Sequence, residues 1–230
     1  PAGLARDAVS ACLDLVALGT VADLVPLDFN NRILVAEGLR RMRAGRTRPG
    51  IAALFRVAGR ELALARSADL GFAIAPRLNA AGRLEDMTIG IDCLLAADTA
   101  TAQVLAARLD ALNIERRALQ QQMQAEAEVL LDSVGAQLSA VEPAVCLFDE
   151  SWHPGIVGLV ANRLKDLTGR PAIAFARCTE TGMLRGSARS VAGLHVRDAM
   201  AAALTTMSGA ALRFGGHAMA AGITLAEADL

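Results

Sequence analysis

Five short segments of this sequence combine charged or hydrogen-bonding side chains with glycine or proline in ways that suit phosphate chemistry. In the first segment, residues 14–23, an apolar helical pattern ends at Gly19, and the carboxylate of Asp23 follows within one turn of chain. Hard cations such as Mg²⁺ and Mn²⁺ bind carboxylate oxygens that rigid elements hold in place. Asp23 is therefore a candidate metal ligand, and the alternative is an ordinary cap or turn residue.

The second segment, residues 76–83, reads Pro-Arg-Leu-Asn-Ala-Ala-Gly-Arg. Its proline and glycine predict a loop that carries Arg77, Asn79 and Arg83. Small neighbours let a phosphate approach the backbone, and arginine binds phosphate through a forked guanidinium. We interpret these three side chains as candidate phosphate ligands, with a solvated loop between two helices as the alternative.

Two further segments lie in the second half of the chain. Residues 151–158 place His153 beside the single tryptophan, just before an expected helix whose free N–H groups and dipole favour an anion. Residues 185–190 follow an expected strand and alternate guanidinium with hydroxyl groups, so Ser187 and Arg189 are candidate phosphate ligands. The alternatives are plain packing for the tryptophan and a surface ion pair for Arg189.

The fifth segment, residues 214–222, reads Phe-Gly-Gly-His-Ala-Met-Ala-Ala-Gly. Paired glycines let the backbone turn tightly and bring His217 to an exposed edge. An imidazole there can stabilise charge, donate a hydrogen bond to a phosphate or move a proton. The alternative is a purely structural histidine.

The elements that must position these side chains change character at Gly135. Before it, apolar residues recur at helical spacing, which predicts helices over residues 5–18, 31–43 and 49–57, one that ends before Pro76, and one over 87–97. After it, short apolar runs alternate with helical patterns, which predicts strands over 144–148, 171–176, 183–187 and 221–225 and helices over 155–167 and 196–207. Such alternation indicates an α/β sandwich.

Residues 99–134 carry the clearest pattern, because one apolar stripe runs along them without a proline or glycine. The stripe consists of Leu105, Leu109, Leu112, Leu119, Met123 and Leu130. A helix of this length spans roughly 50 Å, and its polar second face is typical of a connector between domains. The sequence therefore predicts three parts: a helical segment over 1–98, a long connecting helix over 99–135 and a small α/β domain over 136–230.

Composition sets limits on function. Hydrophobic residues make up 53% of the chain, yet no uncharged apolar run reaches the roughly 18 residues that span a bilayer, so we expect no membrane contact. A formal net charge of −1 gives no bulk support for nucleic-acid binding. The four cysteines are scattered, which argues against a disulfide framework or structural zinc site and fits a reducing cytoplasm.

Taken in order, the segments resemble the RecJ family of single-strand-specific DNA exonucleases, which are DHH-family phosphodiesterases. The matching stretches cover essentially the whole chain and read ALGTVAD, VPLDFNNR, PRLNAAGR, SWHPGIVG, RGSARS and FGGHAMAAG. PRLNAAGR and FGGHAMAAG are far more specific than a short glycine pattern. The chain therefore resembles the C-terminal half of such an enzyme.

The resemblance implies a fold and an activity. Residues 1–98 would be the helical C-terminal part of a DHH domain, and residues 136–230 a DHHA1-type α/β nucleic-acid-binding domain, with the active site in the cleft between them. The family degrades single-stranded DNA from the 5′ end with Mn²⁺ or Mg²⁺, in DNA repair and recombination. Expected partners are single-stranded DNA with a 5′ end and, as further candidates, a single-strand-binding protein or a helicase.

The resemblance also assigns roles by motif. Asp23 would be a catalytic metal ligand, and His217 would face the scissile phosphate. Ser187 and Arg189 match the pair that holds the terminal 5′ phosphate. The remaining candidates would line the same cleft as phosphate ligands, and they are Arg77, Asn79, Arg83 and His153.

The chain departs from the family pattern in what it lacks. The DxD-type and Asp-His-His motifs that supply most metal ligands do not occur in these residues, and neither does an oligonucleotide-binding domain. The first residue is Pro1 and the last residues do not resemble a finished tail, so we interpret the sequence as a fragment. Asp23 alone cannot hold a catalytic ion pair, and we expect little or no nuclease activity from the fragment by itself.

Two alternatives stay open. One is a DHH-family phosphodiesterase that acts on oligoribonucleotides or cyclic dinucleotides, which shares the GGH-type ending. The other is a non-catalytic scaffold that binds nucleic acid. Comparing a long single strand with a dinucleotide as substrate separates the first from an exonuclease, and the retained Asp23, Arg189 and His217 argue against the second.

Overall fold

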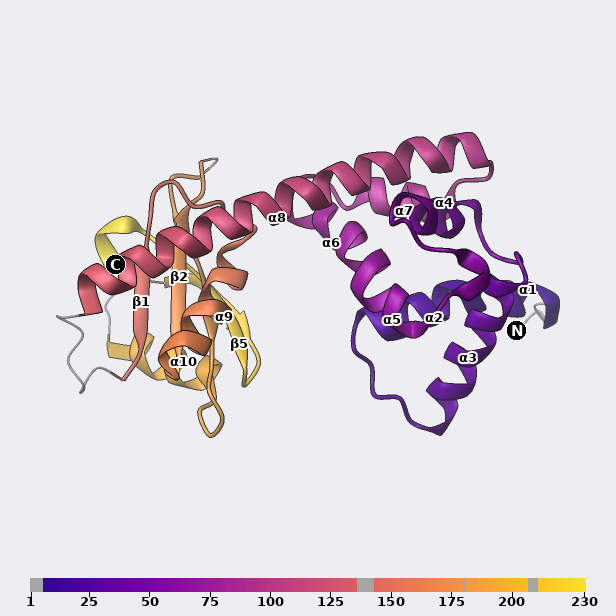
Figure 1. The fold of residues 1–230 in the computed structure, drawn as a ribbon. Coiled ribbons are helices and arrows are strands. Elements are labelled where there is room, and N and C mark those ends of the chain that lie inside the picture. The colour runs from indigo at the N-terminus through magenta and orange to yellow at the C-terminus, as the bar shows by residue number, and fades with distance from the viewer. Residues whose placement is uncertain (1–5, 136–142, 180, 207–210) are drawn as a thin grey trace. The chain divides into compact units, whose positions relative to one another are not determined.

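The computed structural model describes residues 6–135, 143–179, 181–206 and 211–230. The chain divides into two compact units, Pro1–Arg116 and Arg117–Leu230. The division falls inside the longest helix, so each unit contains part of it (Figure 1). The finer three-part division, with the connecting helix as a separate part, stays a proposal.

The first unit is helical. Its elements are α1 (Arg6–Ser10), α2 (Leu13–Ala22), α3 (Phe29–Arg43), α4 (Pro49–Val57), η1 (Leu62–Leu64), α5 (Ser67–Asp69), η2 (Leu70–Ile74), α6 (Ala75–Leu84), α7 (Thr88–Leu95) and the first part of α8 (Thr99–Gly135). The expected helices over 31–43, 49–57 and 87–97 are confirmed to within about two residues. The expected helix over 5–18 is instead two helices, and α2 continues through Gly19 to Ala22.

The prediction that residues 76–83 form a loop is wrong, because they lie in helix α6. The π-helical turn η2 comes directly before α6, so Pro76 falls in the first turn of a new helix. A residue there needs no backbone N–H for helical bonding, and a proline is tolerated. Gly82 is likewise accommodated within α6.

Two glycines let the helices of the first unit pack closely. Gly38 of α3 faces α2, where a side chain would collide with the carbonyl of Leu13 and with Ala17. Gly50 of α4 meets the backbone of Cys93 in α7 in the same way. The close packing of α3 on α2 fixes the helix that ends at the candidate metal ligand.

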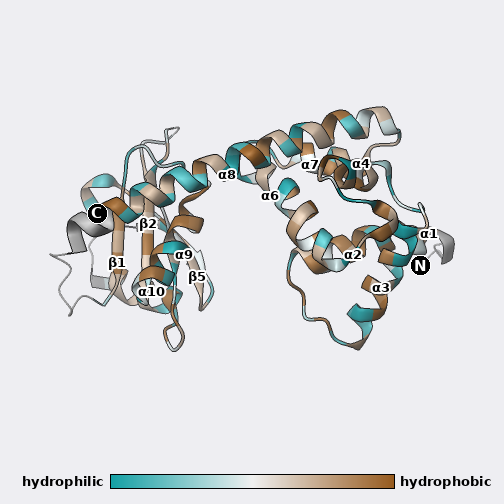
Figure 2. Ribbon diagram, viewed as in Figure 1, coloured by the Kyte–Doolittle hydropathy of each residue, from teal (hydrophilic) through white to brown (hydrophobic). Residues whose placement is uncertain are grey.

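Helix α8 begins at a side-chain cap. The backbone N–H and the hydroxyl of Thr101 donate to the carboxylate of Asp98 at 2.9 and 2.8 Å, and these bonds lower the pKa of Asp98 below its usual value. Hydrophobic and hydrophilic residues alternate along α8 (Figure 2). The predicted stripe is confirmed: Leu109, Leu112 and Met123 are buried. Leu105 and Leu119 are half-buried, and Leu130 lies outside the residues whose side chains are described.

The second unit contains a five-stranded sheet. Its elements after α8 are β1 (Val145–Phe148), α9 (Val157–Thr168), β2 (Ala172–Arg177), β3 (Leu184–Arg189), α10 (Val196–Thr206), β4 (Ala211–Gly216), β5 (Ala220–Leu225) and η3 (Glu227–Asp229). The strand order is β1-β2-β3-β5-β4, with β1 and β2 parallel and the other pairs antiparallel. The α/β class is confirmed, and strand β4, which contains the paired glycines, was not predicted.

The two helices of this sheet pack on opposite faces. Val196 and Met200 of α10 belong to one buried cluster with Phe175, Leu184 and Ile223. Side chains point alternately to the two faces of a strand, so Ser187 and Arg189 project to the other face. That face is covered by α9, which packs on β1, β2 and β3. On the same face, Gly215 of β4 and Gly222 of β5 are exposed.

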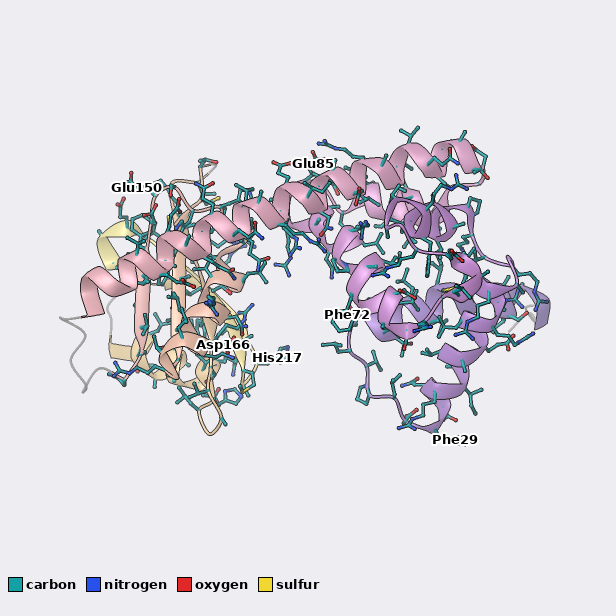
Figure 3. The ribbon with its side chains drawn as sticks, in the orientation of Figure 1. Phe29, Phe72, Glu85, Glu150, Asp166 and His217 are labelled. Atoms are coloured by element: carbon teal, nitrogen blue, oxygen red, sulfur yellow. The ribbon has the colours of Figure 1, made fainter. Side chains whose placement is uncertain are left out.

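No helix in the described part of the chain is long and apolar enough to cross a membrane. The first unit does expose some large apolar side chains. Phe29 and Phe72, which Figure 3 labels, are 78% and 81% exposed, and Leu24 is 88% exposed.

Candidate functional site

Asp23 lies at the exposed C-terminal end of α2. Its backbone N–H donates to the carbonyl of Gly19 at 3.0 Å, and the chain then turns sharply. Leu24 adopts a left-handed conformation with φ of 53°, and the N–H of Val25 bonds back to the carbonyl of Thr20 at 3.0 Å. This is the usual Schellman end of a helix, except that glycine is the residue normally found in the left-handed position. The turn leaves the carboxylate of Asp23 at the helix end, exposed.

Asp14, at the other end of the same motif, has a different role. Its side chain is buried, and its two oxygens accept hydrogen bonds from the Thr47 hydroxyl and the Arg48 N–H, each at 2.9 Å, and from the Arg48 guanidinium. A buried carboxylate is tolerated when its oxygens are paired in this way. The hydrogen bonds of Asp14 therefore hold α2 against the loop before α4. In the sequence, the signal for this role is a carboxylate inside an apolar helical pattern.

The three candidate residues of helix α6 lie on two different sides of the helix. Asn79 and Arg83 are four residues apart, so they share one face, and both are exposed. Arg77 lies on the opposite side, where its Nε donates to Asp110 of α8 at 2.8 Å and its Nη1 donates to the carbonyl of Ala73 at 2.7 Å. Arg77 thus ties α6 to α8, and its role as a phosphate ligand stays a prediction.

Ser187 and Arg189 lie together on β3. The guanidinium of Arg189 donates to the Ser187 hydroxyl oxygen at 2.9 Å and to the carbonyl of Ala188 at 2.8 Å. Gly158, in the first turn of α9, faces both: a Cβ there would lie 2.7 Å from Arg189 Nη2 and 3.0 Å from Ser187 Oγ. A side chain at position 158 would therefore displace the Arg189 guanidinium from the start of α9.

The arrangement suits an anion. The N-terminal turn of α9 has no side-chain cap, and it carries the positive end of the helix dipole. Arg189 adds a full positive charge, and the Ser187 hydroxyl can still donate its proton because its oxygen is the acceptor from Arg189. A phosphate at this place would meet charge, hydroxyl and helix terminus together.

His153 precedes α9 and is fixed by its own turn. Its Nδ1 accepts a hydrogen bond from the N–H of Gly155 at 3.1 Å, so a neutral imidazole carries its proton on Nε2. The neighbouring Trp152 is buried, and its Nε1 donates to Glu126 of α8 at 3.1 Å. The packing interpretation of the tryptophan is confirmed, because its side chain is buried and contacts the part of α8 that belongs to this unit.

His217 lies in the exposed turn between β4 and β5 (Figure 3). Its backbone N–H donates to the carbonyl of Ala220 at 2.8 Å, and Gly216 before it has φ of 152°, where a side chain would collide with Ala220 and Ala221. Ala220 is also the register partner of Arg189 on β3. The fold therefore brings His217 and Arg189 to the same end of the sheet, one strand apart.

The described residues do not form a metal site. Among them there is no group of three or more histidine, cysteine, aspartate or glutamate side chains that could hold a metal ion. Asp23 offers one carboxylate to a metal, and a Mn²⁺ or Mg²⁺ centre of the expected kind does not fit these residues alone.

Comparisons with known proteins agree with the motifs. Residues 139–230 match the model of the DHHA1 domain. The single-stranded-DNA-specific exonuclease RecJ of Dickeya dadantii is 51% identical over 98% of this chain, and that of Escherichia coli is 51% identical over 94%. A crystal structure of RecJ in complex with Mn²⁺ from Thermus thermophilus superimposes with a TM-score of 0.79 at 35% identity over 95% of this chain. The resemblance to the RecJ family is confirmed.

The extent of the match differs between these relatives. The chain spans 39% of the length of the Dickeya dadantii RecJ and 37% of the Escherichia coli RecJ, and it covers 31% of the Thermus thermophilus chain. A second structure of exonuclease RecJ, bound to manganese, matches with a TM-score of 0.77, and 51% of its chain is covered. The activity and the metal of the RecJ proteins are properties of those longer chains.

Proposed function

We propose that this chain is the part of a single-strand-specific 5′→3′ DNA exonuclease that binds the 5′ end of its substrate. The observation that carries the proposal is the Ser187–Arg189 pair beneath the uncapped start of α9, with Gly158 making room for it. A site for a terminal phosphate favours exonuclease action, because only a chain end brings a terminal phosphate.

The chain's own residues then have distinct tasks. Arg189 and the α9 terminus neutralise the terminal phosphate, and the Ser187 hydroxyl orients it by donating a hydrogen bond. His217, at the same end of the sheet, is placed to hydrogen-bond a neighbouring phosphate. Asn79 and Arg83 form an exposed polar face in the first unit that suits a polyanion.

Metal binding requires more than these residues. The proposed enzyme uses Mn²⁺ or Mg²⁺, which activates water and neutralises phosphate charge. Asp23 supplies one ligand, so residues 1–230 alone are expected to have little or no nuclease activity. Mn²⁺-dependent digestion of single-stranded DNA by this chain alone would contradict that expectation.

The cellular setting belongs to the same proposal. A single-strand exonuclease of this type acts in DNA repair and recombination in the cytoplasm, and a single-strand-binding protein or a helicase would supply or extend its substrate.

The test uses the longest protein that the gene for this chain encodes, on 5′-phosphorylated single-stranded DNA with Mn²⁺. We expect digestion from the 5′ end, and Asp23→Asn should lower its rate about 100-fold or more because a metal ligand is lost. Asp28→Asn is the matched control: Asp28 caps α3 through the N–H of Asn31 at 2.8 Å, and asparagine caps equally well.

A second arm tests the phosphate site. Arg189→Ala should remove the preference for a 5′-phosphate over a 5′-hydroxyl end. Cleavage of dinucleotides but not of long strands would instead favour the small-nucleotide phosphodiesterase. Binding of single strands without any cleavage, by a protein with intact metal ligands, would favour the scaffold.

A further inference from the structure

A row of polar side chains crosses the open face of the sheet beyond α9. In the strand register, Arg185 of β3 pairs with Thr224 of β5, and Thr224 pairs with Arg213 of β4. Residues paired across neighbouring strands point to the same face. Arg185 is two residues from Ser187, so the row lies on the face that carries the Ser187–Arg189 pair.

The two arginines of the row have no counter-ion among the described residues. Neither Arg185 nor Arg213 makes a side-chain hydrogen bond or ion pair to any described residue, and both are exposed. Arg163, Arg177 and Arg197 in the same unit each contact a carboxylate within 3.3 Å. The row therefore keeps its positive charge available to a ligand.

The row borders a shallow cavity of about 210 Å³. The residues that line it include no carboxylate, and they are Arg185, Gly186, Arg213, Phe214, Gly215, Gly222, Ile223 and Thr224. Gly222 lies between Ser187 of β3 and Gly215 of β4 in the register. No side chain rises from these two glycines, so a ligand can lie close to the sheet between the arginines.

We propose that Arg185, Thr224 and Arg213 bind internucleotide phosphates of the single strand whose terminal phosphate occupies the Ser187–Arg189 site; this inference rests on the proposed function. Residues two apart on one face of a strand are separated by about 6.6 to 6.8 Å. That spacing is similar to the distance between neighbouring phosphates in an extended strand. The two sites together would hold the strand on the open face of β3, β5 and β4.

The site is expected to bind backbone and to ignore base identity. Its groups are two guanidinium forks and one hydroxyl, which suit phosphate oxygens. Each phosphate that an arginine neutralises on a single strand contributes about 0.7 to the slope of log K against log salt concentration. Replacing both arginines should therefore weaken binding roughly tenfold at moderate salt and reduce the slope by about 0.7 for each phosphate that is no longer neutralised.

The experiment measures binding of a 3′-labelled, 5′-phosphorylated oligothymidylate to the longest protein that the gene encodes, in EDTA so that no cleavage occurs. The test variant is R185Q/R213Q. The control is R197Q, which also replaces arginine with glutamine but lies on α10, at the other face of the sheet. Competition by thymidine 5′-monophosphate reports the terminal-phosphate site alone. Thermal unfolding verifies that the variants are folded.

The expected result is a roughly tenfold weaker oligothymidylate complex with a lower salt slope for R185Q/R213Q, unchanged competition by the mononucleotide, and wild-type behaviour of R197Q. Oligothymidylate binding by R185Q/R213Q with wild-type affinity and slope overturns the inference and leaves the proposed function standing. Equal weakening of the mononucleotide also overturns it, because the arginines would then belong to the terminal site. A wild-type protein that neither binds nor digests single strands would refute the proposed function itself.

Discussion

Two arginines in the first unit and two in the second differ in what their side chains contact. In the first unit, Arg48 is paired with the buried Asp14 and Arg77 with Asp110, so both hold helices together. In the second unit, the Arg189 guanidinium donates to the Ser187 hydroxyl and to the carbonyl of Ala188, and Arg185 makes no ion pair with any described residue. The carboxylate partners of Arg48 and Arg77 explain why these arginines stabilise the fold, whereas Arg185 has no such partner among the described residues and keeps its charge available to a ligand.

The largest effect should come from removing the buried carboxylate. Asp14→Ala leaves the Arg48 guanidinium and the Thr47 hydroxyl without their shared partner, and we expect it to lower the free energy of unfolding by about 3–5 kcal/mol. Urea unfolding monitored by circular dichroism measures this. Asp28→Ala removes only an exposed helix cap and should cost about 1 kcal/mol. Equal losses of stability for the two variants would show that the buried Asp14–Arg48 pair contributes no more to stability than an exposed helix cap.

The next effect separates two arginines of one helix. Arg77→Gln removes charged hydrogen bonds to Asp110 and should lower the free energy of unfolding by about 1.5–3 kcal/mol. Arg83→Gln, on the exposed face of α6, should lower the free energy of unfolding by less than about 1 kcal/mol and should weaken binding to single-stranded DNA. Chemical denaturation and a DNA-binding titration check both; the reverse pattern would mean that Arg77 is the ligand and Arg83 the structural residue.

A third effect is on binding alone. Gly158→Ala should displace the guanidinium of Arg189 and weaken binding of a 5′-phosphorylated strand roughly tenfold, with little change in stability. In an Arg189→Ala background the same substitution should have almost no effect, because residues that act together give non-additive changes. Binding titrations of the wild type, the two single variants and the double variant give the coupling free energy between positions 158 and 189. If the two losses of binding free energy simply add, the two residues do not belong to one site.

The smallest effect concerns the turn after Asp23. Leu24 occupies a left-handed position and its side chain is exposed, so Leu24→Gly should raise the free energy of unfolding by about 1 kcal/mol. Gly45 holds the equivalent position after α3, with φ of 70° and open space around it, and Gly45→Ala should lower stability by a similar amount. Thermal unfolding compares the pair. A destabilised Leu24→Gly protein would show that the leucine side chain makes a contact of its own.

Local patterns predicted most elements. The helices at residues 31–43 and 49–57 and the long helix from residue 99 follow from apolar spacing, a proline at the first helical turn and clear stop signals. Strand β4 was missed because glycines weaken a strand pattern, and its pairing with β5 is a long-range choice. Helix α6 was taken for a loop because the π-turn that accommodates Pro76 leaves no signal in the spacing.

The residues of the candidate site likewise fall into those that the sequence predicted and those that only the tertiary structure revealed. The sequence singled out Ser187, Arg189 and His217 by residue type and neighbouring glycines. The role of Gly158 depends on where α9 crosses β3, and the row from Arg185 to Arg213 depends on strand order, because these residues are far apart along the chain.

The family resemblance, the helical first half, the long amphipathic helix and the α/β second half all followed from the sequence, because they depend on short-range periodicity and on motifs. The pairing of charged side chains did not, because it depends on tertiary packing. Asp14 meets Arg48, and Arg77 meets Asp110, across more than thirty residues of chain. Packing alone places such partners within hydrogen-bonding distance, and the same packing leaves the face with Arg185 and Arg213 open.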